Sequence, residues 1–128
     1  MPENNSKKIL IVEDETPLRT ALVDTLLNEG FEVLESKNGE EGLSVALSDK
    51  PDLILLDLLM PKMNGLQVME KLRSDSWGKE VPIIVLTNRA PDDKIMSDVI
   101  KYEPAFYLVK ATLNLDEVVE KVREIIGK

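Results

Sequence analysis

Apolar and polar residues follow two different periodicities along this chain, and segments of the two kinds alternate. Short apolar runs of β-like composition are each followed by a longer stretch in which apolar residues recur every three or four positions. The apolar runs lie at residues 8–13, 31–36, 52–57, 82–87 and 105–109. This pattern predicts five strand–helix units, which are typical of an α/β domain built on a parallel sheet.

The first and last helices have the clearest boundaries. Thr16 suits an N-cap and Pro17 the first helical position, while Gly30 suits a C-terminal stop. Asn114 is expected to cap the last helix, with Glu117 three residues later as in a variant capping box. The apolar stripe of this last helix consists of Leu115, Val118, Val119, Val122, Ile125 and Ile126.

The middle of the chain adds three more predicted helices and a central strand. The helices are expected at residues 40–48, at residues 65–76, and from Pro91 onward through Ile95, Met96, Val99 and Ile100. Residues 52–57 are almost continuously apolar before Asp57, which predicts a strand buried on both faces at the centre of the sheet.

Composition narrows the chemistry. The chain has 128 residues, which predicts one domain over 1–128 with an ordered core at about 7–127. It contains no cysteine and no histidine, which excludes disulfides, Cys/His zinc sites and acid–base catalysis by its own histidines. A net charge of -8 argues against direct binding to nucleic acid. Without a long apolar run or a signal peptide, no membrane segment is expected, and the cytoplasm is the expected location.

Five polar residues come at the carboxyl ends of the predicted strands, where open parallel sheets bind their ligands. They are Glu13, Asp14, Asp57, Thr87 and Lys110. Three carboxylates at one edge raise one another's pKa unless a cation neutralises them, and Mg²⁺ prefers such oxygen ligands. Asp57 could then act as a nucleophile and form an aspartyl phosphate. The metal, Lys110 and Thr87 would share the charge of the phosphoryl group.

Each of these residues also has an ordinary structural explanation. An acidic pair at a strand end can be a solvated turn, and a single Asp can cap a helix or turn. Thr87 is a good β-former, and Lys110 could be an exposed charge. The functional interpretation rests on their joint position at the ends of successive strands.

Four segments of the sequence carry a resemblance to a known family: ILIVEDE, LILLDLLMPKMNG, PIIVLT and YLVK. Over nearly its whole length the chain resembles the receiver domain of two-component response regulators, of the single-domain kind found in chemotaxis. The resemblance implies a flavodoxin-like, doubly wound fold with a five-stranded parallel sheet in the order 2-1-3-4-5. It also implies phosphoryl transfer to Asp57 from a sensor histidine kinase or a phosphotransfer protein. We therefore expect a signalling domain rather than an enzyme, with no output domain attached to this chain.

The resemblance also implies roles for the metal-binding residues. Asp14, Asp57 and the backbone carbonyl of Leu59 would bind Mg²⁺, and Glu13 would contribute through water or hydrogen bonding. Lys110 would contact the phosphoryl group.

The same resemblance implies a switch. Thr87 would also contact the phosphoryl group, and the ring of Tyr107 would turn inward as the Thr87 hydroxyl moves toward the phosphate. The fourth helix, fifth strand and fifth helix would form the face that binds a downstream protein, an output domain or a second copy of the chain.

The sequence departs from the family pattern in the loops around Asp57. The family has a proline after its lysine, joined by a cis peptide, whereas Ala111 follows Lys110 here. Because a cis bond before a non-proline residue costs about 3 kcal/mol, we predict a trans peptide and a rearranged loop. Asn88, followed by Arg89, stands where a small residue is typical and would narrow access to Asp57. Leu59 and Arg89 could also hinder hydrolytic water, so we predict slow autodephosphorylation.

Three other functions compete with this one. A pseudo-receiver that binds partners without phosphorylation is made plausible by Ala111 and Asn88. A phosphatase of the haloacid dehalogenase kind usually has a second Asp two residues after its nucleophile, where this chain has Leu59. A flavodoxin-like cofactor module needs a phosphate-binding loop after the first strand, where residues 13–15 are all acidic.

Overall fold

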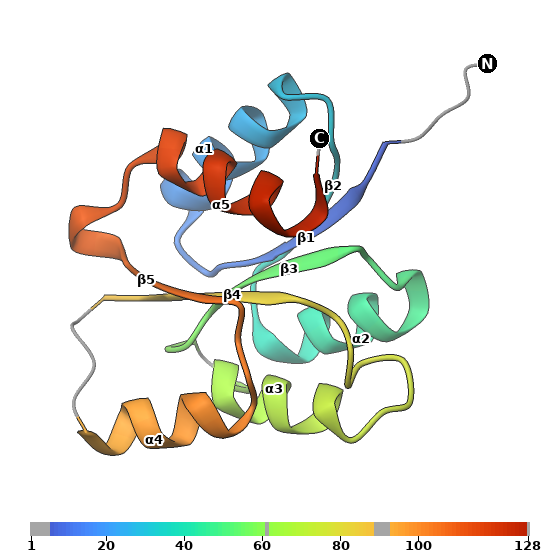
Figure 1. The fold of residues 1–128 in the computed structure, drawn as a ribbon, viewed down its shortest axis with the longest axis vertical. Helices are drawn as coiled ribbons and strands as arrows, with labels where there is room; N and C mark the ends of the chain where they lie inside the picture. Colours follow the sequence, from blue (N-terminus) through green and yellow to red (C-terminus); the bar gives the residue numbers. More distant parts are fainter. Residues whose placement is uncertain (1–5, 61, 89–92, 128) are drawn as a thin grey trace.

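A computed structural model describes residues 6–60, 62–88 and 93–127 of the chain. Within these ranges, five strands and five helices alternate (Figure 1). In chain order they are β1 (Lys8–Val12), α1 (Thr16–Asn28), β2 (Glu32–Ser36), α2 (Gly39–Asp49), β3 (Leu53–Asp57), α3 (Gly65–Arg73), β4 (Ile83–Thr87), α4 (Asp93–Lys101), β5 (Phe106–Val109) and α5 (Leu115–Ile126). A 3₁₀ turn, Lys110–Thr112, separates β5 from α5.

All five strands belong to one parallel sheet in the order β2-β1-β3-β4-β5. The predicted flavodoxin-like α/β fold and strand order are therefore confirmed. Helices α1 and α5 cover one face of the sheet, and α2, α3 and α4 cover the other (Figure 1). The central strand β3 is fully buried, as its apolar run predicts.

The two faces of the sheet carry separate apolar cores because successive side chains of a strand point to opposite faces. In β1, Ile9 and Ile11 pack against the helices α1 and α5, whereas Leu10 and Val12 pack against the other three. The predicted stripe of α5 lies on the first core, with Val118, Val119 and Val122 buried and Leu115, Ile125 and Ile126 partly buried.

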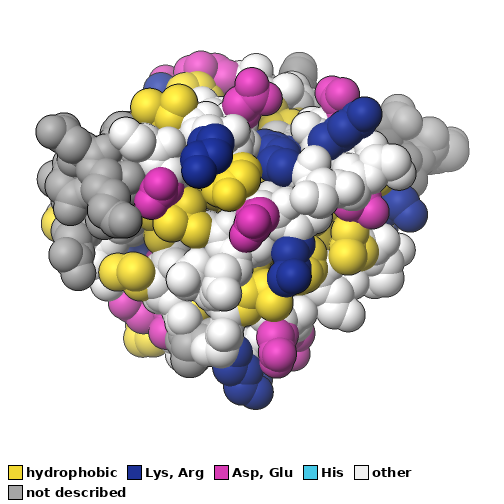
Figure 2. Space-filling view, turned by 90° about the horizontal axis from the view of Figure 1, so that it is seen from below, with side chains coloured by type: hydrophobic (Ala, Val, Ile, Leu, Met, Phe, Trp, Pro, Cys, Tyr) yellow, Lys and Arg dark blue, Asp and Glu magenta, His cyan; other side chains and the backbone are white. Residues whose placement is uncertain are grey.

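The outer side of the α2–α4 layer has a mixed surface. Figure 2, a view of the molecule from below, shows apolar side chains there in small groups separated by charged ones. Among the described helices, none is long and apolar enough to cross a membrane.

The start of α1 corrects one prediction. The N-cap is Glu15 rather than Thr16, and its side chain makes no capping hydrogen bond. The carbonyl of Glu15 accepts the first helical hydrogen bond, from the N–H of Arg19 at 2.9 Å. The N–H of Glu15 is in turn bound by the carboxylate of Glu13 at 3.0 Å. The acidic loop therefore extends into the helix start, and Thr16 is already helical.

The end of α3 corrects another prediction. The helix ends at Arg73 instead of Ser76. The carboxylate of Asp75 accepts hydrogen bonds from the N–H groups of Trp77 and Gly78, both at 2.9 Å. These bonds offer the backbone an alternative to the helical pattern, and the chain turns away toward β4.

The other predicted helix boundaries are mostly correct. Asn114 caps α5 by accepting from the N–H groups of Asp116 and Glu117. The return bond from the Glu117 side chain, expected for a full capping box, is absent from the described hydrogen bonds. A complete capping box occurs instead at Asn64 and Gln67, at the start of α3, where none was predicted.

The start of α4 lies partly beyond what the structure describes. Pro91, its predicted first residue, falls outside the described ranges, as do the side chains of Ile95 and Met96. Of the two remaining apolar positions, Val99 is buried and Ile100 is 60% exposed. Ile100 therefore faces solvent rather than the core.

Candidate functional site

The carboxyl ends of β1 and β3 bring the predicted carboxylates together. Glu13 follows β1 directly, and its N–H donates to the carbonyl of Ser36 at 3.0 Å, which extends the pairing with β2 by one residue. Asp57 is the last residue of β3. Glu13 and Asp57 are buried, and Asp14 is partly buried. Carboxylate oxygens of these three residues lie within 4.8 Å of one another. We refer to these three residues as the acid cluster.

Lys110 reaches the acid cluster from the end of β5. Its Nζ lies 2.9 Å from Oε2 of Glu13 and 3.2 Å from Oδ2 of Asp57. A third carboxylate, that of Glu15, lies 3.7 Å away. Only 6% of the Lys110 side chain is exposed. One buried ammonium group therefore partly neutralises the cluster.

The peptide between Lys110 and Ala111 is trans, since the described residues contain no cis peptide bond. The prediction of a trans peptide is confirmed. The loop after β5 forms the 3₁₀ turn, which the N–H of Leu113 closes on the carbonyl of Lys110 at 3.1 Å. Lys110 enters the site from this turn.

Burial and mutual repulsion shift the protonation of the cluster. Burial, followed by the negative charge of Glu13, raises the pKa of Asp57 to about 7, although Lys110 partly opposes the shift. Burial also raises the pKa of Glu13, despite its hydrogen bonds from Glu15 and Lys110. For Lys110, burial alone lowers the pKa, but contact with Glu13 and Asp57 outweighs it and the net pKa is raised. The cluster holds more negative charge than Lys110 balances.

The loop after β3 holds Asp57 by its backbone. The N–H of Leu59 donates to Oδ1 of Asp57 at 3.2 Å. Gly65 lies so close behind that a Cβ there would be 2.6 Å from the Asp57 carbonyl oxygen, which makes glycine necessary at this position. The Leu59 side chain is 49% exposed. The structure thus shows the N–H of Leu59 at the site, while metal binding by its carbonyl stays a prediction.

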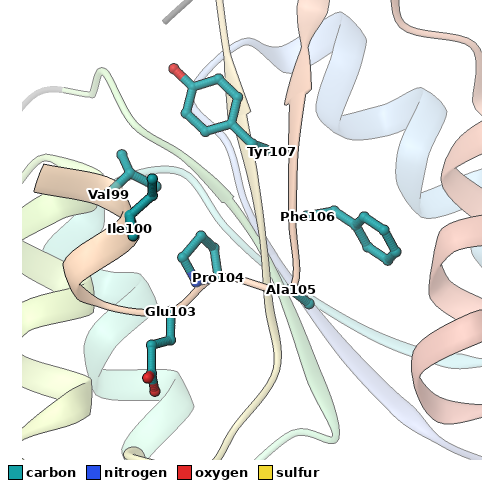
Figure 3. A pocket seen from close by; sticks show the side chains of 7 residues that line it. All are labelled: Val99, Ile100, Glu103, Pro104, Ala105, Phe106 and Tyr107. Carbon is teal, nitrogen blue, oxygen red and sulfur yellow. The ribbon is translucent and has the colours of Figure 1, made fainter. Parts of the chain in front are cut away.

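Thr87 and Tyr107 lie on the neighbouring strands β4 and β5. Thr87 is buried at the end of β4, next to β3, but its hydroxyl makes no described hydrogen bond to the acid cluster. Val85 pairs with Tyr107 and Thr87 with Val109, so the Thr87 and Tyr107 side chains point to the same face of the sheet. Figure 3 shows the Tyr107 ring on the α4 side, opposite Phe106. Their roles as a switch stay predictions.

Two contacts of the site were not foreseen from the sequence. Glu15 adds a third carboxylate near Lys110, besides those of Glu13 and Asp57. Arg19, in the first turn of α1, donates from Nη1 to the carbonyl of Glu13 at 2.8 Å. The only available signal was the position of Arg19 close behind the acidic loop, because a side chain that binds backbone leaves no motif.

Comparison with known proteins gives one consistent family. The family model described as "Response regulator receiver domain" matches residues 9–123. The response regulator ArlR of Staphylococcus aureus is 36% identical over 94% of this chain, which covers 53% of that protein. The phosphate regulon regulator PhoB of Pseudomonas aeruginosa is 39% identical over 68% of this chain and 38% of that protein. The chain thus spans about a third to a half of the length of these relatives.

Solved structures agree with the sequence comparisons. The chemotaxis protein CheY4 of Vibrio cholerae has a TM-score of 0.86 at 28% identity, covering 94% of this chain and 98% of that one. The receiver domain of a sensor histidine kinase from Pseudomonas aeruginosa, solved with a magnesium ion coordinated in its active site cleft, has a TM-score of 0.85 at 26% identity, covering 96% and 99%. The chain belongs to the response regulator receiver domain family of two-component signalling.

Proposed function

We propose that this domain accepts a phosphoryl group on Asp57 in the presence of Mg²⁺ and then changes its affinity for a partner. The observation that carries the proposal is the buried acid cluster, in which the pKa of Asp57 is raised to about 7. Buried carboxylates destabilise a fold unless something pairs with them, so a buried cluster of three in one place points to a functional site. Lys110 supplies only part of the required charge.

The residues present fit a magnesium ion. Oε1 of Glu13 is buried and has no hydrogen-bond partner among the described residues. The candidate ligand atoms of the acid cluster are all carboxylate oxygens, and Mg²⁺ prefers oxygen ligands. Asp14, Asp57 and the carbonyl of Leu59 would hold the ion, and Glu13 would bind it through water. Bound there, Mg²⁺ would supply positive charge to the oxygens of the phosphoryl group.

The chain's own groups support transfer to Asp57. With a phosphohistidine donor, the P–N bond breaks, the imidazole keeps the electron pair, and a P–O bond forms to the Asp57 carboxylate. Oδ1 of Asp57 is oriented by the N–H of Leu59, and Oδ2 lies 3.2 Å from Nζ of Lys110. Lys110 is therefore already beside the position where the transferred oxygens would carry charge. The Thr87 hydroxyl would donate to one of them.

The output face would comprise α4, β5 and α5. A groove of about 470 Å³ lies on this side of the molecule, and Figure 3 shows the residues that line it. They are Val99, Ile100, Glu103, Pro104, Ala105, Phe106 and Tyr107. Because Tyr107 lines the groove, a change of its ring position would alter the groove's shape. A downstream protein, an output domain or a second copy of the chain would respond to that change.

The test is incubation with Mg²⁺ and acetyl phosphate, followed by intact-mass measurement. We expect one phosphoryl adduct on the parent and none on Asp57→Asn. Asp24→Asn, an exposed change on α1, is the matched control and should be modified like the parent. An adduct on Asp57→Asn, or none on the parent, would contradict the proposal.

One alternative within the family stays testable by the same experiment. Asn88 is exposed beside the site, and Ala111 follows Lys110, so a pseudo-receiver that binds partners without phosphorylation is the second candidate. A parent protein that binds Mg²⁺ but takes no phosphoryl group would favour it. The haloacid dehalogenase and flavodoxin alternatives lose their support, since the chain belongs to the receiver family.

A further inference from the structure

Arg19 joins three elements around the acidic loop. From α1, its Nη1 donates to the carbonyl oxygen of Glu13 at 2.8 Å, and its Nε donates to Oε1 of Glu35 in β2 at 3.0 Å. The Arg19 side chain is 16% exposed, whereas that of Glu35 is 53% exposed. The buried end of this arrangement is therefore the bond to the Glu13 carbonyl, and Glu35 contacts the guanidinium from the solvent side.

The Glu13 carbonyl matters because it belongs to the peptide that leads into Asp14. A peptide unit is planar, so fixing its carbonyl oxygen also fixes the direction in which the chain enters the next residue. Two more bonds hold the same loop, from the N–H of Glu13 to the Ser36 carbonyl and from the N–H of Arg19 to the Glu15 carbonyl. Arg19 is the only side chain among the described residues that holds this peptide.

Asp14 depends on that peptide more than the other two acids do. Glu13 accepts from Lys110 and from the N–H of Glu15, and Asp57 contacts Lys110 and accepts from the N–H of Leu59. The carboxylate of Asp14 bonds to the side chain of Asp57, and no N–H group or cation in the described part of the chain binds it. Its direction toward the cluster therefore depends on its backbone more than that of Glu13 or Asp57 does.

We infer that Arg19 is a positioning residue for the cation site, which acts by orienting the Glu13–Asp14 peptide. This inference rests on the proposed magnesium site. Groups that orient metal ligands typically change metal affinity 10–100-fold when removed. The sign of the effect is informative, because Arg19 is positively charged. Its removal would strengthen cation binding if charge alone mattered, whereas loss of positioning weakens it.

The experiment measures Mn²⁺, as a probe for the site, by electron paramagnetic resonance of the free ion at about 0.15 M salt. We expect one bound Mn²⁺ on the parent protein and affinity about 10-fold lower for Arg19→Met. Glu35→Gln is the matched control, since it removes the ion pair but leaves the guanidinium free to bind the Glu13 carbonyl. It should stay within about twofold of the parent, because Glu35 is exposed and screened. Circular dichroism establishes that each variant is folded.

The outcomes separate the two proposals. Failure of the parent to bind Mn²⁺ would overturn the magnesium site and this inference with it. Binding by the parent, with equal or tighter binding by folded Arg19→Met, would overturn only the role of Arg19. An equal loss in Glu35→Gln would do the same, because the ion pair would then explain the effect. Should Arg19→Met fail to fold, Arg19→Gln carries the test, since its shorter and uncharged side chain lacks the guanidinium that binds the Glu13 carbonyl.

Discussion

Replacing Asp57 by Asn should stabilise the folded protein when no divalent cation is present, although Asp57 is buried in the core of the site. Burial and the charge of Glu13 raise the pKa of Asp57 from 3.8 to about 7. At about 1.4 kcal/mol per pH unit, this corresponds to about 4 kcal/mol of lost stability once both the folded and unfolded states are ionised. Asp57 is only 1% exposed, so solvent screens little of this cost.

The net gain will be smaller than that upper figure. The carboxylate of Asp57 contacts Lys110 at 3.2 Å and accepts from the N–H of Leu59. The raised pKa already includes these two contacts, but the Asn amide pairs poorly with Lys110 and leaves buried polar groups unpaired, which costs about 1–3 kcal/mol. We therefore expect Asp57→Asn to raise the free energy of unfolding by about 1–3 kcal/mol at pH 8.

The pH dependence has a definite sign. Between about pH 4 and 7, the folded protein keeps a proton on Asp57 that the unfolded chain has already lost. Stability from this group therefore falls as pH rises through that window. This contribution should be missing in Asp57→Asn, so that only the fall due to the raised pKa of Glu13 is left. The assay is urea unfolding followed by circular dichroism at pH 4, 6 and 8 with a chelator present. The gain should shrink toward pH 4.

Added Mg²⁺ should reverse the comparison, because the parent gains stability by binding the ion and Asp57→Asn gains less. Asp24→Asn, which removes an exposed carboxylate of α1, should match the parent throughout. The reasoning is refuted if Asp57→Asn is no more stable than the parent at pH 8 in chelator, or if it keeps the parent's dependence on pH between 4 and 7.

Two further predictions concern positions around the site and at the opposite end of the sheet. Arg73 donates to the backbone carbonyls of Gly78, Val81, Tyr102 and Glu103. Arg73→Met should lower the free energy of unfolding by about 3 kcal/mol, because it leaves these backbone carbonyls without a partner. Arg73→Lys should recover part of that loss. A loss below about 1 kcal/mol in urea unfolding of Arg73→Met would contradict the prediction. Exposed Leu59 and Asn88 flank Asp57, and the double variant Leu59→Asn, Asn88→Ala should shorten the lifetime of the phosphorylated form, so equal lifetimes measured by intact mass would remove the idea of slow hydrolysis.

The strands were the most predictable part of the fold. Strand β3 is buried on both faces, so its apolar run has no competing explanation. The order of strands followed from the family resemblance rather than from periodicity, because apolar runs of similar composition do not specify their neighbours. The end of α3 was not predictable, since it depends on Asp75 binding the N–H groups of Trp77 and Gly78. Whether the helix continues or ends at these residues depends on local hydrogen-bond geometry, which the apolar pattern of the sequence does not specify.

The acid cluster was predictable because topology alone brings it together. Parallel strands place their carboxyl ends at one edge, so acids that follow β1 and β3 must meet there. The predicted place of Thr87 at the same edge is correct, but its contact with the phosphoryl group depends on a state of the site that contains phosphate. Arg19 escaped prediction because it acts through a backbone carbonyl, and a side chain that binds the backbone leaves no sequence motif.

Lys110 keeps its place at the acid cluster although the next residue, Ala111, departs from the family pattern. Ala111 predicted a trans peptide, and the Lys110–Ala111 peptide is trans, within a 3₁₀ turn. Even so, Nζ of Lys110 contacts both Glu13 and Asp57. The lysine stem has several rotatable bonds, so its end can reach the same point from different backbone directions. The two buried carboxylates favour an ammonium group at this point, because leaving buried charges unpaired costs several kcal/mol. The placement of the ammonium group is thus determined by the charge of the cluster more than by the conformation of the peptide that follows it.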